Sequence, residues 1–150
     1  DEVVYAANLR LQTMSRNRYS LERSDYTGGG RGKQGLDLAV MDAFTGQSRP
    51  ANTLSGGETF LASMALALGL ADVIQSYAGG IHMDTMFIDE GFGTLDPDTL
   101  ELAMETLVKL QSSGRLIGMI SHVPELKTRI PAHLEVTRGD DGSTAKFVIN

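Results

Sequence analysis

The sequence predicts an α/β fold whose core is a parallel strand–helix–strand unit. Two short apolar segments, residues 85–90 and 115–121, flank an amphipathic helical segment at 97–113. Strands connected through a helix in this way lie parallel, with a right-handed crossover. Alternating segments before and after the unit predict flanking β-hairpins, and the first residues predict a helix. With 150 residues, the chain has the size of one domain with its own core.

Composition excludes several classes of protein. Hydrophobic residues make up 41% of the chain and charged residues 21%, which is typical of neither disordered nor fibrous proteins. The sequence has no cysteine, so disulfides, thiolate zinc sites and cysteine nucleophiles are excluded within it. We find no apolar run near the ~18 residues of a membrane span and no leader segment. We therefore expect no membrane contact and a cytoplasmic location.

The net charge of −6 argues against a nucleic-acid binder with a basic surface all over. The charge is uneven, however, because residues 1–35 hold six basic and four acidic residues. Any contact with a polyanion such as DNA would therefore use the N-terminal third, and the alternative is that its basic residues are simply solvated. These residues are Arg10, Arg16, Arg18, Arg23, Arg31 and Lys33.

The first predicted helix covers residues 1–17. Its apolar residues recur at heptad-like spacings of three and four, at Val4, Ala7, Leu11 and Met14. Two heptads are too few to establish a coiled coil. A seam that begins with the chain nevertheless suggests the end of a longer helix.

Two alternating segments, 19–26 and 36–41, predict strands joined by a glycine-rich hairpin loop at 28–35. Residues 45–52, which follow, are predicted to be irregular and polar. The remaining predicted elements are, in order, a helix at 58–77, a strand at 85–90, a helix at 97–113, a strand at 115–121 and a hairpin over 133–138 and 143–149. Asp96-Pro97 is a typical helix start, and Gly114 a typical stop.

The glycine-rich loop invites comparison with a phosphate-binding Walker A loop because it contains Gly32-Lys33. The spacing does not fit. Thr27 stands where the first glycine of that motif belongs, and Gln34 stands where its magnesium-binding hydroxyl belongs. We therefore do not expect this loop to bind nucleotide.

Chemically useful side chains follow both strands of the predicted parallel unit. Asp89-Glu90 ends the first strand, and Ser121-His122 ends the second. Ligands of parallel sheets bind outside the carboxyl ends of the strands. Two adjacent acids after an apolar strand fit a Walker B arrangement, in which Asp89 holds Mg²⁺ and Glu90 accepts a proton from an attacking water. The alternative is an ordinary solvated strand end.

The segment Thr53-Leu54-Ser55-Gly56-Gly57-Glu58 opens the longest predicted helix and supports two interpretations. Ser55 and Glu58 have the spacing of a capping box, which is a structural role. Two glycines are not needed for a cap and weaken a helix. Close backbone approach by an anion such as phosphate, favoured at a helix N-terminus, would explain them.

Four motifs in this order resemble those of ABC-type ATPases. Leu54-Ser55-Gly56-Gly57-Glu58 resembles the signature motif and Met86-Phe87-Ile88-Asp89-Glu90 resembles Walker B. Gly93-Thr94-Leu95-Asp96 resembles the D-loop, and His122 falls where the switch histidine lies. The sequence Asp89-Glu90-Gly91-Phe92-Gly93 differs from the one that follows Walker B in transporter ATPases. Together with Glu58 at the end of the signature-like motif, it is similar to the SbcC family of SMC-like ATPases in double-strand-break repair.

The resemblance implies that this chain is the C-terminal lobe of an ATPase head. Residues 1–17 would be the end of a returning coiled-coil helix, and residues 18–150 the lobe. Two heads would close around ATP and Mg²⁺, with Ser55, Gly56, Gly57 and Glu58 facing the γ-phosphate held by the other head. Asp89 would hold Mg²⁺, Glu90 would polarise water, His122 would sense the γ-phosphate and Asp96 would communicate across the dimer.

The resemblance also implies partners. These are the N-terminal lobe of the same protein, a second head, an SbcD-type nuclease and double-stranded DNA, in the bacterial cytoplasm at the nucleoid. The Walker A loop and the Q-loop belong to the N-terminal lobe, so we expect this chain alone to be inactive. Two other hypotheses remain: a non-hydrolysing scaffold lobe for DNA or nuclease, and a transporter ATPase, which the 91–93 wording disfavours.

Overall fold

The computed structural model describes residues 1–23, 38–77 and 84–149 and divides the chain into two units, Asp1–Ile120 and Ser121–Asn150. The predicted glycine-rich loop at 28–35, with Arg31 and Lys33, lies outside the described residues. In order, the first unit contains α1 (Glu2–Met14), β1 (Tyr19–Arg23), β2 (Leu38–Asp42), β3 (Gln47–Pro50), α2 (Gly56–Tyr77), β4 (Thr85–Asp89), α3 (Pro97–Ser112) and β5 (Leu116–Ile120).

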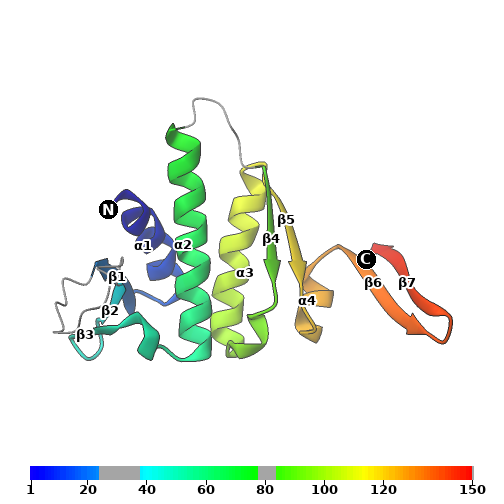
Figure 1. Cartoon of the computed structure of the whole chain (residues 1–150), viewed down its shortest axis with the longest axis horizontal. Helices are drawn as coiled ribbons and strands as arrows, with labels where there is room; N and C mark the ends of the chain where they lie inside the picture. Colours follow the sequence, from blue (N-terminus) through cyan, green and yellow to red (C-terminus); the bar gives the residue numbers. More distant parts are fainter. Residues whose placement is uncertain (24–37, 78–83, 150) are drawn as a thin grey trace, which may run out of the picture. The chain divides into compact units, whose positions relative to one another are not determined.

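The predicted parallel strand–helix–strand unit is confirmed. Strands β4 and β5 pair in parallel, with Thr85 opposite Leu116 and Asp89 opposite Ile120. Helix α3 connects them and lies beside them (Figure 1). Asp96 caps α3 by accepting a hydrogen bond from the Thr99 N–H at 3.1 Å, as the sequence predicts. The acid-bearing end of β4 is therefore fixed in register with the end of β5.

The apolar character of segment 85–90 predicts a buried strand, and within the described residues this prediction is wrong. Met86 and Ile88 are half-buried, whereas Phe87, between them, is 75% exposed. The β4–β5 sheet has only two strands there, so one face is partly covered and the other meets solvent. Leu116 and Ile120 of β5 are likewise exposed.

Strands β1, β2 and β3 form a three-stranded antiparallel sheet. The predicted pairing of the first two alternating segments is confirmed. The prediction that residues 45–52 are irregular is wrong for Gln47–Pro50, which pair with β2 from Ala39 to Asp42. This strand is short, polar and mostly exposed, so its pairing depends on backbone hydrogen bonds that hydrophobic alternation does not reveal.

The predicted first helix is confirmed as α1. Three members of its apolar seam, Ala7, Leu11 and Met14, are buried. Helix α1 lies beside α2 (Figure 1), and Gly69 of α2 abuts the α1 backbone at Ala7. Burial of the seam is thus explained by packing within the first unit, and its continuation into a coiled coil stays a prediction.

Helix α2 is the longest helix described and begins two residues before the predicted start. By length and composition alone it is apolar enough to cross a membrane, so the expectation that no segment approaches this length was wrong. Core helices pass the same test. One side of α2 packs inside the unit, through residues that include Leu61, Ala65 and Leu68, and Asp72 on this helix is ion-paired.

The second unit contains α4 (Pro124–Arg129), β6 (Ala132–Gly139) and β7 (Gly142–Ile149). The predicted C-terminal hairpin is confirmed, with Gly139 opposite Gly142 at its turn. Helix α4 has six residues and begins at Pro124, and it was not predicted from the sequence.

Burial within α1 generates a prediction about stability. Leu11 is 1% exposed and Leu9, on the same helix, is 55% exposed. We expect Leu11→Ala to lower the free energy of unfolding by about 2–5 kcal/mol, because it removes packed methyl groups and leaves a cavity. Leu9→Ala is the matched control and should cost less than about 1 kcal/mol. Urea denaturation followed by circular dichroism measures both, and equal losses would contradict the packing described.

Candidate functional site

The acid pair Asp89-Glu90 lies at the carboxyl end of the parallel sheet. Asp89 is the last residue of β4 and is exposed. The backbone N–H of Glu90 donates a hydrogen bond to the carbonyl oxygen of Ile120 at 2.8 Å. The second acid is therefore anchored to β5 at the point where the sheet ends.

The backbone turns sharply at the acid pair. Glu90 has a φ of +56°, and Gly91 follows with a φ of +97°. A left-handed conformation is uncommon for a residue with a side chain and costs free energy, so such residues concentrate at functional sites. Gly91 is required for a second reason, because a Cβ there would overlap the ring of Phe60 on α2. The strained turn is held in place by α2.

The turn leads into a short 3₁₀ segment, η2 (Phe92–Thr94), that packs under the first turns of α2. Phe92 is buried, and its ring meets that of Phe60 edge-on, with centroids 4.9 Å apart. A Cβ on Gly57 would lie 2.8 Å from the carbonyl oxygen of Thr94. The signature-like start of α2 and the D-loop-like segment are therefore in direct contact.

Helix α2 begins with the predicted capping box. The Glu58 N–H donates to Ser55 Oγ at 3.3 Å, and the Ser55 N–H donates to Glu58 Oε2 at 2.8 Å. Ser55 and Gly56 remain exposed at the positive end of the helix. The predicted capping box is therefore present. Ser55 and Gly56, which an anion would approach, remain accessible.

The two glycines of the segment have different explanations. Gly57 is needed because Thr94 of the same chain approaches it, and this contact involves no ligand. A Cβ on Gly56 would make only ordinary contact with the Thr94 side chain, at 3.6 Å. Packing therefore explains Gly57 but not Gly56, and close approach of a ligand to Gly56 stays a prediction.

Glu58 is held inside the protein by three donors. Its carboxylate accepts hydrogen bonds from the Tyr19 hydroxyl, the Ser55 N–H and Arg49 Nη2, the last at 3.0 Å. Partial burial by itself would raise the pKa of Glu58, but these hydrogen bonds outweigh it and lower that pKa to about 2. Burial, and then the bond to Glu58, raise the pKa of Tyr19 to about 12. The Glu58 carboxylate is therefore occupied by internal contacts, and its predicted role toward a nucleotide stays a prediction.

Arg18 extends this network beside the signature-like segment. Its guanidinium lies 4.8 Å from the centre of the Tyr19 ring and 5.1 Å from that of Phe44. It also pairs with buried Asp42 at 3.0 Å, and hydrogen bonds from Arg18 are the main cause of a lowered Asp42 pKa. The bond between Tyr19 and Glu58 could not be predicted from the sequence, because the two residues are 39 positions apart and no local pattern joins them.

A cavity of about 440 Å³ brings these segments together. Its lining includes Ser55 and Gly57 from the start of α2, Thr94 and Asp96 from the D-loop-like segment, and Arg18. Hydrogen bonds from Thr99 hold the carboxylate of Asp96 and lower its pKa. Signature-like and D-loop-like residues thus share one cavity, and their predicted roles at a dimer interface stay predictions.

His122 belongs to the second unit, and Asp89 and Glu90 belong to the first. Its placement next to the acid pair therefore stays a prediction. Within the described parts of the chain, no group of three or more His, Cys, Asp or Glu side chains is arranged to hold a metal ion. Any magnesium ion at Asp89 would need most of its ligands from elsewhere.

The predicted basic surface of the N-terminal third is largely neutralised. Each of the four arginines that the structure describes pairs with an aspartate, and the pairs are Arg10–Asp72, Arg16–Asp98, Arg18–Asp42 and Arg23–Asp1. Arg31 and Lys33 lie outside the described residues. The described residues therefore give this region no clear excess of free positive charge.

A comparison of the chain with known protein families identifies a family that is consistent with these motifs. Residues 31–109, more than half of the chain, match the family described as SbcC/RAD50-like, Walker B motif. The chain belongs to this family. It is 52% identical over 148 residues to the SbcC component of the SbcCD nuclease of Vibrio cholerae serotype O1 and 52% identical over 150 residues to that of Staphylococcus haemolyticus. It spans 99–100% of its own length in these matches but only 15% of theirs.

Solved structures show that this member of the SbcC/RAD50-like family has the fold of SMC heads. The Smc head domain of Pyrococcus furiosus, bound to the C-terminal domain of ScpA, matches with a TM-score of 0.70 at 16% identity, over 99% of this chain and 35% of that one. The SMC head domain of Thermotoga maritima matches with a TM-score of 0.62 at 18% identity, over 98% and 47%. The predicted α/β head-lobe fold is confirmed.

The two glycines of α2 generate a prediction. Gly57→Ala should lower the free energy of unfolding by about 1–3 kcal/mol, because the new methyl group collides with the Thr94 carbonyl. Gly56→Ala is the matched control and should stay within about 0.5 kcal/mol of the wild type. Urea denaturation measures both variants. Equal destabilisation by the two would refute the contact that we describe.

The Glu58 network generates a pH dependence. The pKa of Glu58 is lower in the folded chain than its ordinary value of 4.5, so the stability it contributes is present above that value and is lost as the pH falls toward about 2. We expect Glu58→Gln to lower the free energy of unfolding by about 1–3 kcal/mol at pH 7 and by much less near pH 3. Denaturation of both proteins across this range measures the difference. Exposed Glu105, as Glu105→Gln, is the control, and a pH-independent loss at Glu58 would count against the network.

Proposed function

We propose that this chain is the C-terminal half of an ATP-hydrolysing head in an SbcC-type DNA-repair ATPase. The observation that carries the proposal is the turn at Asp89-Glu90. An acid pair ends a parallel strand, its second member is held in a left-handed conformation, and the turn is locked against the signature-bearing helix. Strain of this kind is retained where the position of a side chain matters for function.

Asp89 suits a magnesium ligand and Glu90 suits a general base. Asp89 is exposed at the end of β4, and no bond to its carboxylate is found among the described residues. Mg²⁺ usually takes one or two protein carboxylates and completes its shell with water and nucleotide phosphates, which fits a site with few protein ligands. The metal would neutralise phosphate charge, while Glu90 would accept a proton from the attacking water.

The start of α2 supports a role opposite a second head. Ser55 and Gly56 are exposed at the positive end of a long helix, where the γ-phosphate of ATP held by the other head would be stabilised. Gly57 and Glu58 would act as positioning residues, because their contacts are internal. Asp96 would report across the dimer from the cavity it shares with Ser55, and His122 would sense the γ-phosphate.

The remaining parts of the ATPase site and of the repair complex would come from other polypeptide segments. We found no Walker A spacing in the sequence, so the phosphate loop would be supplied by an N-terminal lobe. Relatives at 52% identity are named as the SbcC component of the SbcCD nuclease, which supports a partner nuclease of the SbcD type. ATP-driven closure of two heads would then gate access of double-stranded DNA to that nuclease. The complex would act in the bacterial cytoplasm, at the nucleoid.

Replacement of the proposed base tests this function in the full-length protein that carries the chain. Glu90→Gln keeps the size of the side chain but removes its basicity, so turnover of ATP should fall about 100-fold or more. ATP binding and ATP-dependent head association should persist. Glu105→Gln, an exposed change on α3, is the matched control and should hydrolyse ATP like the wild type.

The result that would refute the proposal is a Glu90→Gln protein with turnover within about twofold of the wild type, since loss of a general base costs far more. That result would favour a scaffold lobe that binds DNA or nuclease without hydrolysing ATP.

A further inference from the structure

Arg49 of strand β3 lies on the face of its sheet that packs into the first unit. It stands directly opposite Val40 of β2, which in turn stands opposite Leu21 of β1. Residues opposite one another in antiparallel strands share a face of the sheet. Leu21 and Val40 are only 2% and 1% exposed, so the third member of this row is a charged residue in line with two core residues. A half-buried guanidinium at such a place needs specific partners.

The partners of Arg49 lie on both sides of the signature-like segment. Its Nη1 donates to the carbonyl oxygen of Thr53 at 2.8 Å, and its Nη2 donates to Glu58 Oε2 at 3.0 Å. Thr53 is the last residue of a short 3₁₀ segment, η1 (Ala51–Thr53), and directly precedes Leu54. Glu58 is the last residue of the signature-like motif. One planar guanidinium therefore joins the residue before the motif to the residue that ends it.

The Glu58 oxygen that Arg49 contacts also fixes the backbone at Ser55. Oε2 accepts hydrogen bonds from both Arg49 and the Ser55 N–H, while Oε1 accepts one from the Tyr19 hydroxyl. Charge-assisted hydrogen bonds from a guanidinium are strong and hold a carboxylate in one orientation. Arg49 is therefore separated by one shared oxygen atom from Ser55, which remains exposed at the helix start.

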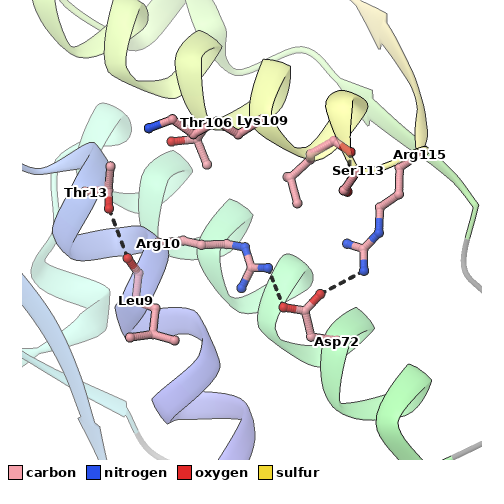
Figure 2. A pocket seen from close by; sticks show the side chains of 9 residues that line it. Leu9, Arg10, Thr13, Asp72, Thr106, Lys109, Ser113 and Arg115 are labelled. Atoms are coloured by element: carbon pink, nitrogen blue, oxygen red, sulfur yellow. Dashed lines mark hydrogen bonds and ion pairs between the residues drawn. The ribbon is translucent and has the colours of Figure 1, made fainter.

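The far part of α2 is anchored independently of Arg49. Figure 2 shows Asp72, about four turns further along this helix, between Arg10 of α1 and Arg115, which precedes β5. Its Oδ1 pairs with Arg115 Nη2 at 2.9 Å, and its Oδ2 pairs with Arg10 Nη2. Loss of Arg49 would therefore loosen the start of α2 and leave the rest of the helix in place.

An inward-pointing charge on an edge strand has a second use, which is to discourage pairing with another molecule. Strand β3 is an edge of the sheet that the described residues form, so Arg49 fits this use as well. A lysine would serve it equally. The two bonds of Arg49, to a carbonyl and to a carboxylate, instead use the guanidinium fork, which an ammonium group does not reproduce.

We propose that Arg49 is a positioning residue for the signature-like segment: by joining Thr53 to Glu58, it fixes exposed Ser55 and Gly56 for the nucleotide of a second head. The inference rests on the proposed function and gives β3 a part in head association. Arg49 itself touches no nucleotide. Its loss leaves each head able to bind nucleotide but weakens the ATP-dependent association of two heads, because the segment that meets the second nucleotide is no longer held in advance.

Arg49→Gln in the full-length protein tests the inference. We expect ATP-dependent head association, measured by energy transfer between labelled heads, to weaken about tenfold and kcat to fall by a similar factor. Affinity for ADP should be unchanged, because ADP lacks the γ-phosphate that the second head would contact. Ser48→Ala, on the same strand but the opposite face, is the matched control and should behave like the wild type.

Arg49→Lys decides the matter if Arg49→Gln fails to fold, because it keeps the positive charge. An ammonium group replaces only one of the two bonds, so head association should still weaken about threefold. Wild-type association in Arg49→Lys would overturn the inference and leave edge protection as the role of this residue. Equal losses of ADP affinity and head association in Arg49→Gln would also overturn it, since a general structural defect affects both.

Failure of this inference and failure of the proposed function give different results. If Glu90→Gln hydrolyses ATP like the wild type, the proposed function fails and this inference fails with it. If Glu90→Gln loses turnover while Arg49→Gln keeps wild-type head association and kcat, only the role of Arg49 is refuted.

Discussion

The close contact between the first turns of α2 and the turn after β4 is the constraint on which the site depends. Thr94 lies against Gly57, Phe60 covers Gly91, and Phe92 fills the space beneath them. Through this contact a helix start and a strand end that are about thirty residues apart behave as one rigid piece. A shift of either would move the exposed signature residues and the acid pair together.

The charged side chains around the start of α2 hold this helix in position. Glu58 gathers donors from Tyr19 on β1 and Arg49 on β3, so the small antiparallel sheet is tied to the helix that carries Ser55. Arg18 stacks beside Tyr19 and neutralises buried Asp42 in the same region. The sheet therefore acts as a support for the site, although none of its residues carries a recognised motif.

Much of the fold could be predicted because its signals are local. The parallel strand–helix–strand unit, the Asp96 cap and the terminal hairpin each follow from spacing within a few residues. Strand β3 escaped prediction because it is short and polar, and the exposure of Phe87 did so because an apolar strand looks the same whether or not another element covers it. The site was predicted in part: the capping box at Ser55 could be expected, while the Tyr19–Glu58 bond depends on tertiary packing. The resemblance identified the motifs, but it could not show that Gly57 is explained by Thr94.

The two-stranded β4–β5 sheet has a practical consequence for anyone who produces this segment by itself. Each strand keeps one unpaired backbone edge among the described residues, next to the outward ring of Phe87. Such edges and rings invite pairing between molecules, and concentrated samples tend to aggregate. Co-expression with a companion polypeptide that shields this sheet is therefore the sounder route to soluble material.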